Sequence, residues 1–162
     1  MADGWRAMYQ IHLYVPKTGV LTPAMLAWLY SYGQSGRQPE RFWPVRKLNP
    51  KALARLLLRL DPGLEPSPGE RETVQLRYPH PELSITLYLH ERGVIVEFPY
   101  VGSLLARIVL GIAYTYIRFL YDQAGFWSYD PQLKIVSYAD DYQSIDETAQ
   151  LMDELLPRLL SG

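Results

Sequence analysis

The stretch "LSITLYLHERGVIVEFPYV", residues 83–101, decides the fold class. Apolar residues alternate with other residues on both sides of a turn at Glu91–Gly93: Leu83, Ile85, Leu87 and Leu89 before it, and Val94, Val96 and Phe98 after it. A period of two with one apolar face predicts a β-hairpin that lies on a core by one side only. Tyr88 and His90 are expected on its other side.

Further strands are expected around this hairpin. Residues 9–15, 73–78, 126–129 and 133–139 are rich in branched and aromatic residues, and Gly, Pro or Asp lie next to most of them. We therefore expect a mainly antiparallel sheet of about five to six strands.

Helical signals separate these strands. Residues 22–33 and 49–60 each begin with an N-cap residue, Thr22 or Asn49, followed by proline. Residues 103–123 predict a long helix that crosses the sheet and ends at Gly125. Its expected apolar face holds Leu104, Leu105, Ile108, Val109, Ile112, Tyr116, Phe119 and Leu120.

The C-terminal residues 144–160 predict an amphipathic helix, with Ser144 and Glu147 as a capping box. Hairpins without regular strand–helix–strand alternation indicate an α+β fold, with the sheet packed against the long helix and this C-terminal helix. The length of 162 residues fits a single domain, 1–162.

The segment "DPGLEPSPGE", residues 61–70, has three prolines and two glycines and is expected to be a loop. It separates a basic helical part from an acidic, sheet-rich part. Residues 1–60 hold nine Lys/Arg against two Asp/Glu, and residues 61–162 hold seven against fifteen. Two such halves can neutralise each other in the fold or serve partners.

Composition excludes several classes of protein. The chain has no cysteine, which excludes disulfides, thiolate metal sites and a cysteine nucleophile. We identify no signal peptide at the start of the chain. The longest apolar run is interrupted by Arg107 and Arg118, and a membrane span needs about 20 mostly apolar residues. We therefore expect a cytoplasmic protein with no membrane span.

Signatures of catalysis are missing from the sequence. His80 and Glu82 form an isolated pair in a turn, which favours a structural role over metal binding. The sequence has no nucleophile elbow, phosphate-binding loop or dinucleotide fingerprint. We therefore predict no catalytic residue, metal or cofactor, although a site assembled from distant residues remains open. His12 and His90 lie on separate expected strands, and the sequence does not establish that they share a surface.

Charged clusters suggest binding surfaces. Acidic pairs occur at residues 140–141, 146–147 and 153–154, and Asp153 and Glu154 are expected on the solvent side of the C-terminal helix. Phe42, Trp43 and Arg46 lie in an arginine-rich segment. Basic residues interleaved with aromatic ones can bind nucleic acid, but an isoelectric point near 6.3 argues against it. Trp43 is expected to anchor its loop to the core or to a partner.

The segments "LDPGLEP", "ITLYLHERGVIVEFPY" and "GFWSYDPQL" occur in this order. The region of about residues 50–135 resembles a group of small bacterial proteins with a glycine–aromatic–x–x–Y–D–P–Q segment. The "YDPQ" tetrapeptide is also similar to segments of immunity and accessory proteins from bacterial toxin systems. The resemblance implies a cytosolic partner-binding protein without catalysis and carries over no catalytic residue.

The segment "GFWSYDPQL", residues 125–133, does not need chemistry to explain it. Asp130 and Pro131 fit the first two positions of a type I turn, because Asp bonds the backbone two residues on and Pro presets φ. The side chains of Trp127 and Tyr129 either pack inward or stand on a sheet face that meets a partner.

Two functions therefore remain open. The first is a non-enzymatic protein-binding protein of the immunity, adaptor or accessory type, with Phe42, Trp43, Arg46, Trp127, Tyr129, Asp153 and Glu154 as its partner-binding residues. The second is a small-molecule or anion-binding domain, or an enzyme, with a pocket between the sheet and the long helix. Its anion would be held by Arg107, Tyr114 and Arg118.

Overall fold

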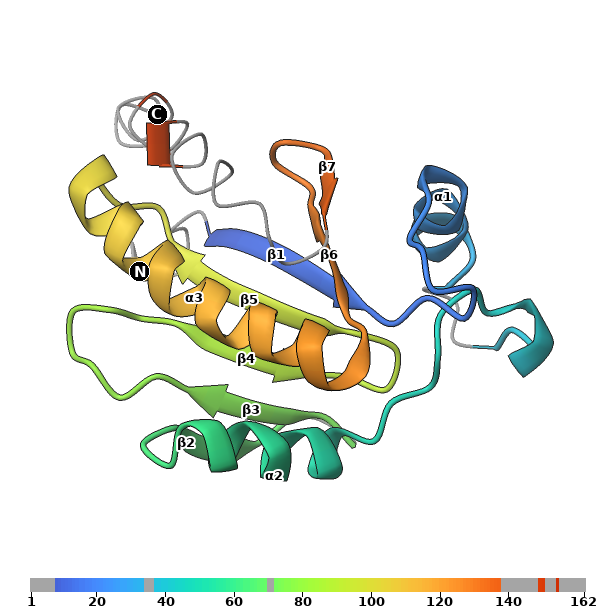
Figure 1. Ribbon diagram of the computed structural model, residues 1–162, viewed down its shortest axis with the longest axis horizontal. Coiled ribbons are helices and arrows are strands. Elements are labelled where there is room, and N and C mark those ends of the chain that lie inside the picture. The colour runs from blue at the N-terminus through green and yellow to red at the C-terminus, as the bar shows by residue number, and fades with distance from the viewer. Residues whose placement is uncertain (1–7, 34–36, 70–71, 138–148, 151–153, 155–162) are drawn as a thin grey trace, which may run out of the picture.

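The computed structural model describes residues 8–33, 37–69, 72–137, 149–150 and 154. These residues form one antiparallel sheet of seven strands with the order β2-β3-β4-β5-β1-β6-β7 (Figure 1). The α+β class is confirmed. The strands are β1 (Met8–Tyr14), β2 (Glu65–Pro68), β3 (Val74–Arg77), β4 (Thr86–Leu89), β5 (Val94–Pro99), β6 (Trp127–Asp130) and β7 (Ile135–Ser137). The α-helices with described bounds are α1 (Pro23–Ser31), α2 (Pro50–Leu60) and α3 (Ser103–Ala124), and a short 3-10 helix, η3 (Glu40–Phe42), lies between α1 and α2.

The β4–β5 hairpin has the predicted alternation. Leu87 pairs with Val96 and Leu89 with Val94, and all four side chains are buried. The N–H of His90 donates to the carbonyl of Gly93 and closes the turn. β5 then pairs with β1, so the N-terminal strand lies inside the sheet between β5 and β6.

The helix ends follow the local signals. Thr22 accepts a hydrogen bond from the N–H of Met25 at 3.3 Å, and Asn49 accepts one from Ala52 at 3.1 Å. α3 ends at Gly125, whose φ of 74° is in the left-handed region that glycine tolerates best. The predicted caps of all three helices are therefore confirmed.

The strand count and the loop prediction require correction. Glu65–Pro68, inside the segment expected to be a loop, forms β2 and pairs with β3. Proline is tolerated there because β2 is an edge strand. On the side of an edge strand that faces solvent there is no neighbouring strand, so a missing N–H costs no hydrogen bond between strands. The sheet therefore has seven strands in place of the expected five to six.

α3 covers one face of the sheet, and α2 lies beside β3 and β4 on the same side (Figure 1). The expected apolar face of α3 was partly wrong, because Leu104 is 79% exposed and Ile108 is 51% exposed. The buried face is Ala106, Val109, Leu110, Ala113, Tyr114, Tyr116, Ile117 and Leu120. It includes two alanines, whose small side chains leave room for the helix to lie close to the sheet.

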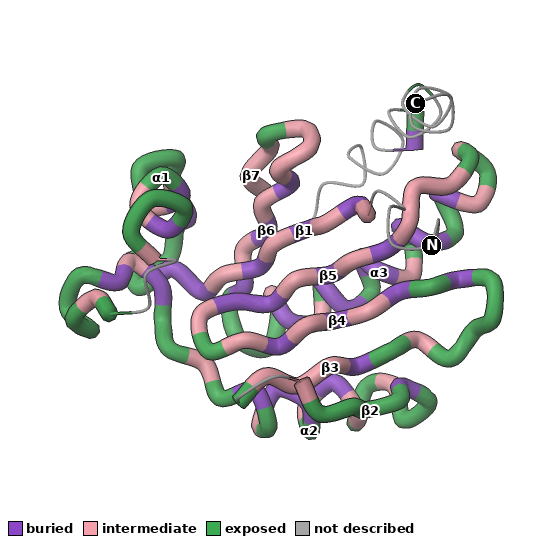
Figure 2. The backbone as a smooth tube through the Cα atoms, turned by 180° about the vertical axis from the view of Figure 1, so that it is seen from behind, coloured by how far each residue is buried: buried purple, intermediate pink, exposed green. Residues whose placement is uncertain are grey.

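Among the described α-helices, only α1 lies on the opposite face of the sheet, at one end of it. α1 packs there in a second apolar cluster with Leu26, Leu29, Trp43 and Val45 at its centre. Figure 2 shows β3, β4 and β5 from this side, with none of the described helices in front of them. The residues of this face are half-buried along β1, β4 and β5, whereas their neighbours on the α3 side are buried.

The expected C-terminal helix lies mostly outside the described residues, its capping box included. Ala149, Gln150 and Glu154 are helical, and Ala149 is buried in the main core.

Candidate functional site

A cleft of about 810 Å³ lies on the sheet face opposite α3. It is bounded by the sheet, by α1 and by the turn between β4 and β5. Its lining includes His12, Tyr14, Tyr30, Trp43, His90 and Arg92. We call it the histidine–tyrosine cleft.

Strand register brings its floor together. His12 pairs with Ile95 of β5 on one side and with Tyr129 of β6 on the other. Ile95 in turn pairs with Tyr88 of β4. Directly paired residues project from the same face of a sheet, so side chains from four strands meet in one row.

Hydrogen bonds link the polar side chains of this face. The hydroxyl of Tyr88 donates to Glu97 Oε2 at 3.0 Å, and Gln10 Nε2 donates to Glu97 Oε1 at 2.9 Å. Gln10 Oε1 therefore faces His12, whose Nε2 lies 3.1 Å away. An amide oxygen only accepts, so Nε2 of His12 carries the proton.

The second nitrogen of His12 continues the chain to α1. Nδ1 of a neutral imidazole protonated at Nε2 is an acceptor, and the Tyr30 hydroxyl lies 2.5 Å from it. Tyr30 therefore donates to His12, and the Tyr14 hydroxyl, 3.3 Å from that of Tyr30, donates to Tyr30. The result is a hydrogen-bonded path across β4, β5, β1 and α1.

Electrostatics favour the neutral form of both cleft histidines. Burial lowers the pKa of His12 below 6.5; Asp130 opposes this shift, and His90 adds to it. Burial also lowers the pKa of His90, whose ring stacks on Tyr88 at 6.4 Å between centroids. The structure thus places the two histidines in one cleft, which the sequence left open.

At the rim of the cleft, Arg92 contacts both Trp43 and Glu40. The guanidinium of Arg92 lies 4.2 Å from the ring centroid of Trp43 and forms an ion pair with Glu40. The hydrogen bond from Arg92 is the main reason that the pKa of Glu40 falls to about 2. Trp43 donates from Nε1 to the carbonyl of Gln38 at 3.2 Å. These contacts fix the orientation of both rim side chains.

The predicted partner-binding residues lie in several places. Tyr129 and Trp127 stand on the cleft face of the sheet and pack against the α1 cluster, with the Tyr129 ring 6.0 Å from that of Tyr30. Trp43 is 8% exposed inside the same cluster, and Phe42 beside it is 52% exposed. Of the remaining three, Arg46 is exposed outside the cleft, Glu154 is exposed, and Asp153 lies outside the described residues.

The predicted anion site is not assembled as expected. Arg107 and Arg118 are exposed on the outer side of α3, and Nε of Arg118 lies 4.0 Å from Oδ2 of Asp122. Tyr114, expected on that side with them, is instead 8% exposed within the core. α3 turns this tyrosine toward the sheet because the buried face is centred on the neighbouring Leu110, Ala113 and Ile117.

Sequence reasoning missed Tyr14, Tyr30 and Arg92 as cleft residues, together with the path through Gln10 and Glu97. The available signal was that Tyr88 and His90 fall on the polar side of an alternating strand. Its meaning depends on the strand order β4-β5-β1-β6, which pairs segments far apart in the chain.

Comparisons add no identification: no family model, curated protein or solved structure matches this chain. Among the described residues, no group of three or more His, Asp or Glu side chains could hold a metal ion. α3 is long and apolar enough to cross a membrane by length and composition alone. In the structure one of its faces packs on the sheet.

Proposed function

We propose that the protein is a non-enzymatic cytosolic binding protein of the immunity, adaptor or accessory-subunit type, and that its partner protein sits on the histidine–tyrosine cleft. The observation that carries the proposal is the cleft beside α1, whose lining combines tyrosine, tryptophan and histidine side chains with Arg92, Glu72 and Glu91. None of the described helices lies in front of β3, β4 and β5 on this face of the sheet (Figure 2). Tyr, Trp and Arg are the side chains most enriched at binding hot spots.

The side chains of the cleft are held in fixed positions, which supports the proposal. Tyr14, Tyr30 and His12 hold one another by hydrogen bonds, and Arg92 is held by Glu40 and Trp43. Side chains that are already fixed lose little rotamer entropy when a partner binds, so more of the contact energy contributes to affinity.

Phe42, Trp127 and Tyr129 belong to this proposed surface because they lie on or next to the α1 cluster beside the cleft. Arg46 and Glu154 are exposed elsewhere, and together with Asp153 they stay predictions for the edge of a larger interface. Rim charges of this kind change association rate more than affinity.

A photo-crosslinking experiment tests the proposal. Phe42 is replaced by p-benzoylphenylalanine, a conservative change at a 52% exposed position, and the protein is irradiated in an extract of its native host. We expect one specific protein adduct, which weakens when Tyr30→Ala is added. The matched control places the same crosslinker at Thr115, an exposed residue on the outer side of α3. Identical adducts at both positions would contradict the proposal.

A small ligand in the same cleft is the second candidate, because about 810 Å³ is within the range of ligand-binding sites. The same variants separate the two functions. A small-molecule site predicts no specific adduct at Phe42, together with a compound that raises the melting temperature of the wild type but not of Tyr30→Ala.

A further inference from the structure

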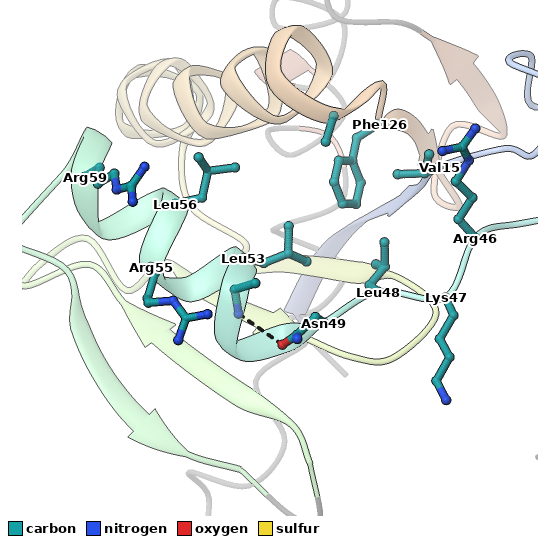
Figure 3. A pocket seen from close by; sticks show the side chains of 12 residues that line it. Val15, Arg46, Lys47, Leu48, Asn49, Leu53, Arg55, Leu56, Arg59 and Phe126 are labelled. Atoms are coloured by element: carbon teal, nitrogen blue, oxygen red, sulfur yellow. Dashed lines mark hydrogen bonds between the residues drawn. The ribbon is translucent and has the colours of Figure 1, made fainter.

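A second cavity, of about 590 Å³, lies between α2 and the end of α3, on the side of the sheet that these helices cover (Figure 3). Its apolar part includes Leu53, Leu56 and Phe126. Phe126 is 1% exposed and Leu53 is 9% exposed, so the floor is part of the packed core. We call this cavity the α2 groove.

Cationic side chains flank the apolar floor from two sides. Arg55 and Arg59 come from α2, one helical turn apart, and Arg46 and Lys47 come from the connector before α2 (Figure 3). None of the described residues that line the groove is acidic. Lys47 forms an ion pair with Glu91 at 2.9 Å, whereas no ion pair joins Arg46, Arg55 or Arg59 to any residue in the described ranges.

Backbone hydrogen bonds to the ends of β1 and of the β4–β5 turn hold the connector that carries Arg46. The N–H of Arg46 donates to the carbonyl of Val15 at 2.8 Å, and the N–H of Leu48 donates to that of Glu91 at 2.6 Å. Asn49 caps the first turn of α2. The two walls are therefore pre-formed, and binding does not require the backbone to be ordered first.

We infer that the α2 groove binds an anionic amphiphile, that is, a phosphate or carboxylate head on an aliphatic tail. The unpaired guanidinium groups suit the head, because arginine matches the geometry of phosphate and carboxylate oxygens. The apolar floor suits the tail. A ligand with only the anionic head would leave the apolar floor exposed to water. A neutral amphiphile would cover the floor but would form no ion pair with the arginines. This site is separate from the cleft of the proposed function.

The same chemistry is available from a free molecule or from a lipid headgroup, so the experiment has two arms. In the first, decyl phosphate below its micelle concentration is titrated into the protein by calorimetry, with inorganic phosphate and decyl maltoside as probes of head and tail alone. In the second, sedimentation measures binding to phosphatidylglycerol vesicles against phosphatidylcholine vesicles.

We expect decyl phosphate to bind the wild type at least about tenfold more tightly than either partial probe, and to raise its melting temperature. The double variant Arg55→Gln/Arg59→Gln should lose about tenfold or more in affinity. The matched control Lys51→Gln/Arg77→Gln removes the same charge from exposed residues that do not line the groove, and it should keep the affinity. If the protein binds phosphatidylglycerol vesicles but not free decyl phosphate, the natural ligand of the groove is a lipid headgroup with the same chemistry.

Leu56→Asn separates the tail from the head. Leu56 is half-buried in the groove, so this variant should weaken decyl phosphate binding and leave inorganic phosphate binding unchanged. The inference is overturned if neither decyl phosphate nor anionic vesicles bind the wild type. It is also overturned if the control variant loses as much affinity as the groove variant, or if inorganic phosphate binds as tightly as decyl phosphate.

Discussion

The side-chain amide of Gln132 bonds both backbone groups of Gln10, as a paired strand would. Gln10 N–H donates to Gln132 Oε1 at 3.1 Å, and Gln132 Nε2 donates to the carbonyl of Gln10 at 2.8 Å. β6 ends at Asp130, so the glutamine side chain continues the ladder beyond it. Asp130 accepts the N–H groups of Gln132 and Leu133 at 2.9 and 3.0 Å, which confirms the predicted Asp-Pro turn.

Gln132→Ala should therefore destabilise the junction of β1 and β6. Two hydrogen bonds to backbone groups are lost, each worth about 0.5–1.5 kcal/mol, so we expect a loss of about 1–3 kcal/mol. Urea unfolding measures it, with Gln75→Ala on β3 as control. An equal loss in both variants would refute the strand-like role of Gln132.

Two glycine substitutions should act in opposite directions. A Cβ at Gly93 would lie 2.9 Å from both the Leu13 carbonyl oxygen and the Tyr14 ring, whereas a Cβ at Gly111 in α3 meets nothing within 4 Å. Gly93→Ala should thus be destabilising, by about 1–3 kcal/mol. Gly111→Ala should be stabilising by about 0.5–1 kcal/mol, because glycine in a helix costs backbone entropy. Chemical denaturation of both variants checks the signs.

Trp43 and Phe42 are neighbours with different expected effects. Trp43 is 8% exposed and its ring contacts that of Trp28 at 5.0 Å, so Trp43→Ala should lose about 3–5 kcal/mol of stability. Phe42→Ala, at a 52% exposed position, should change stability by less than about 0.5 kcal/mol. Phe42 is therefore the better variant for measuring partner binding. Comparable stability losses in the two variants would contradict this assignment.

Stability should fall on acidification because the pKa of His12 and of His90 is lowered by burial. Below about pH 6.5 the unfolded histidines bind protons that the folded ones do not yet bind, so the free energy of unfolding decreases until the folded pKa values are reached. Unfolding in urea at pH 7.5 and at pH 5.5 measures the slope. His12→Gln should reduce it, and His80→Gln, at an exposed loop position, should not.

The sequence predicted what local chemistry determines. Alternation gave the β4–β5 hairpin, and the Thr22 and Asn49 caps gave two helix starts, because each signal acts within a few residues. β2 was missed because prolines break most strands but not an edge strand. The histidine–tyrosine cleft was missed because the pairing of His12 with Tyr129 joins strands more than 100 residues apart.

Tyr30→Phe tests the hydrogen-bonded path at its link between the sheet and α1. The Tyr30 hydroxyl donates to Nδ1 of His12 and so stabilises the neutral imidazole. Removing the hydroxyl while keeping the ring should raise the pKa of His12 toward 6.5, which a proton NMR titration of the imidazole measures directly. The control is Tyr32→Phe, two residues along the chain, where the ring lies against that of Trp28. This variant keeps the Tyr30 hydroxyl and should leave the pKa of His12 unchanged. A His12 titration that is the same in all three proteins would show that Tyr30 does not set the protonation of His12, and the direction of the path would have to be reassigned.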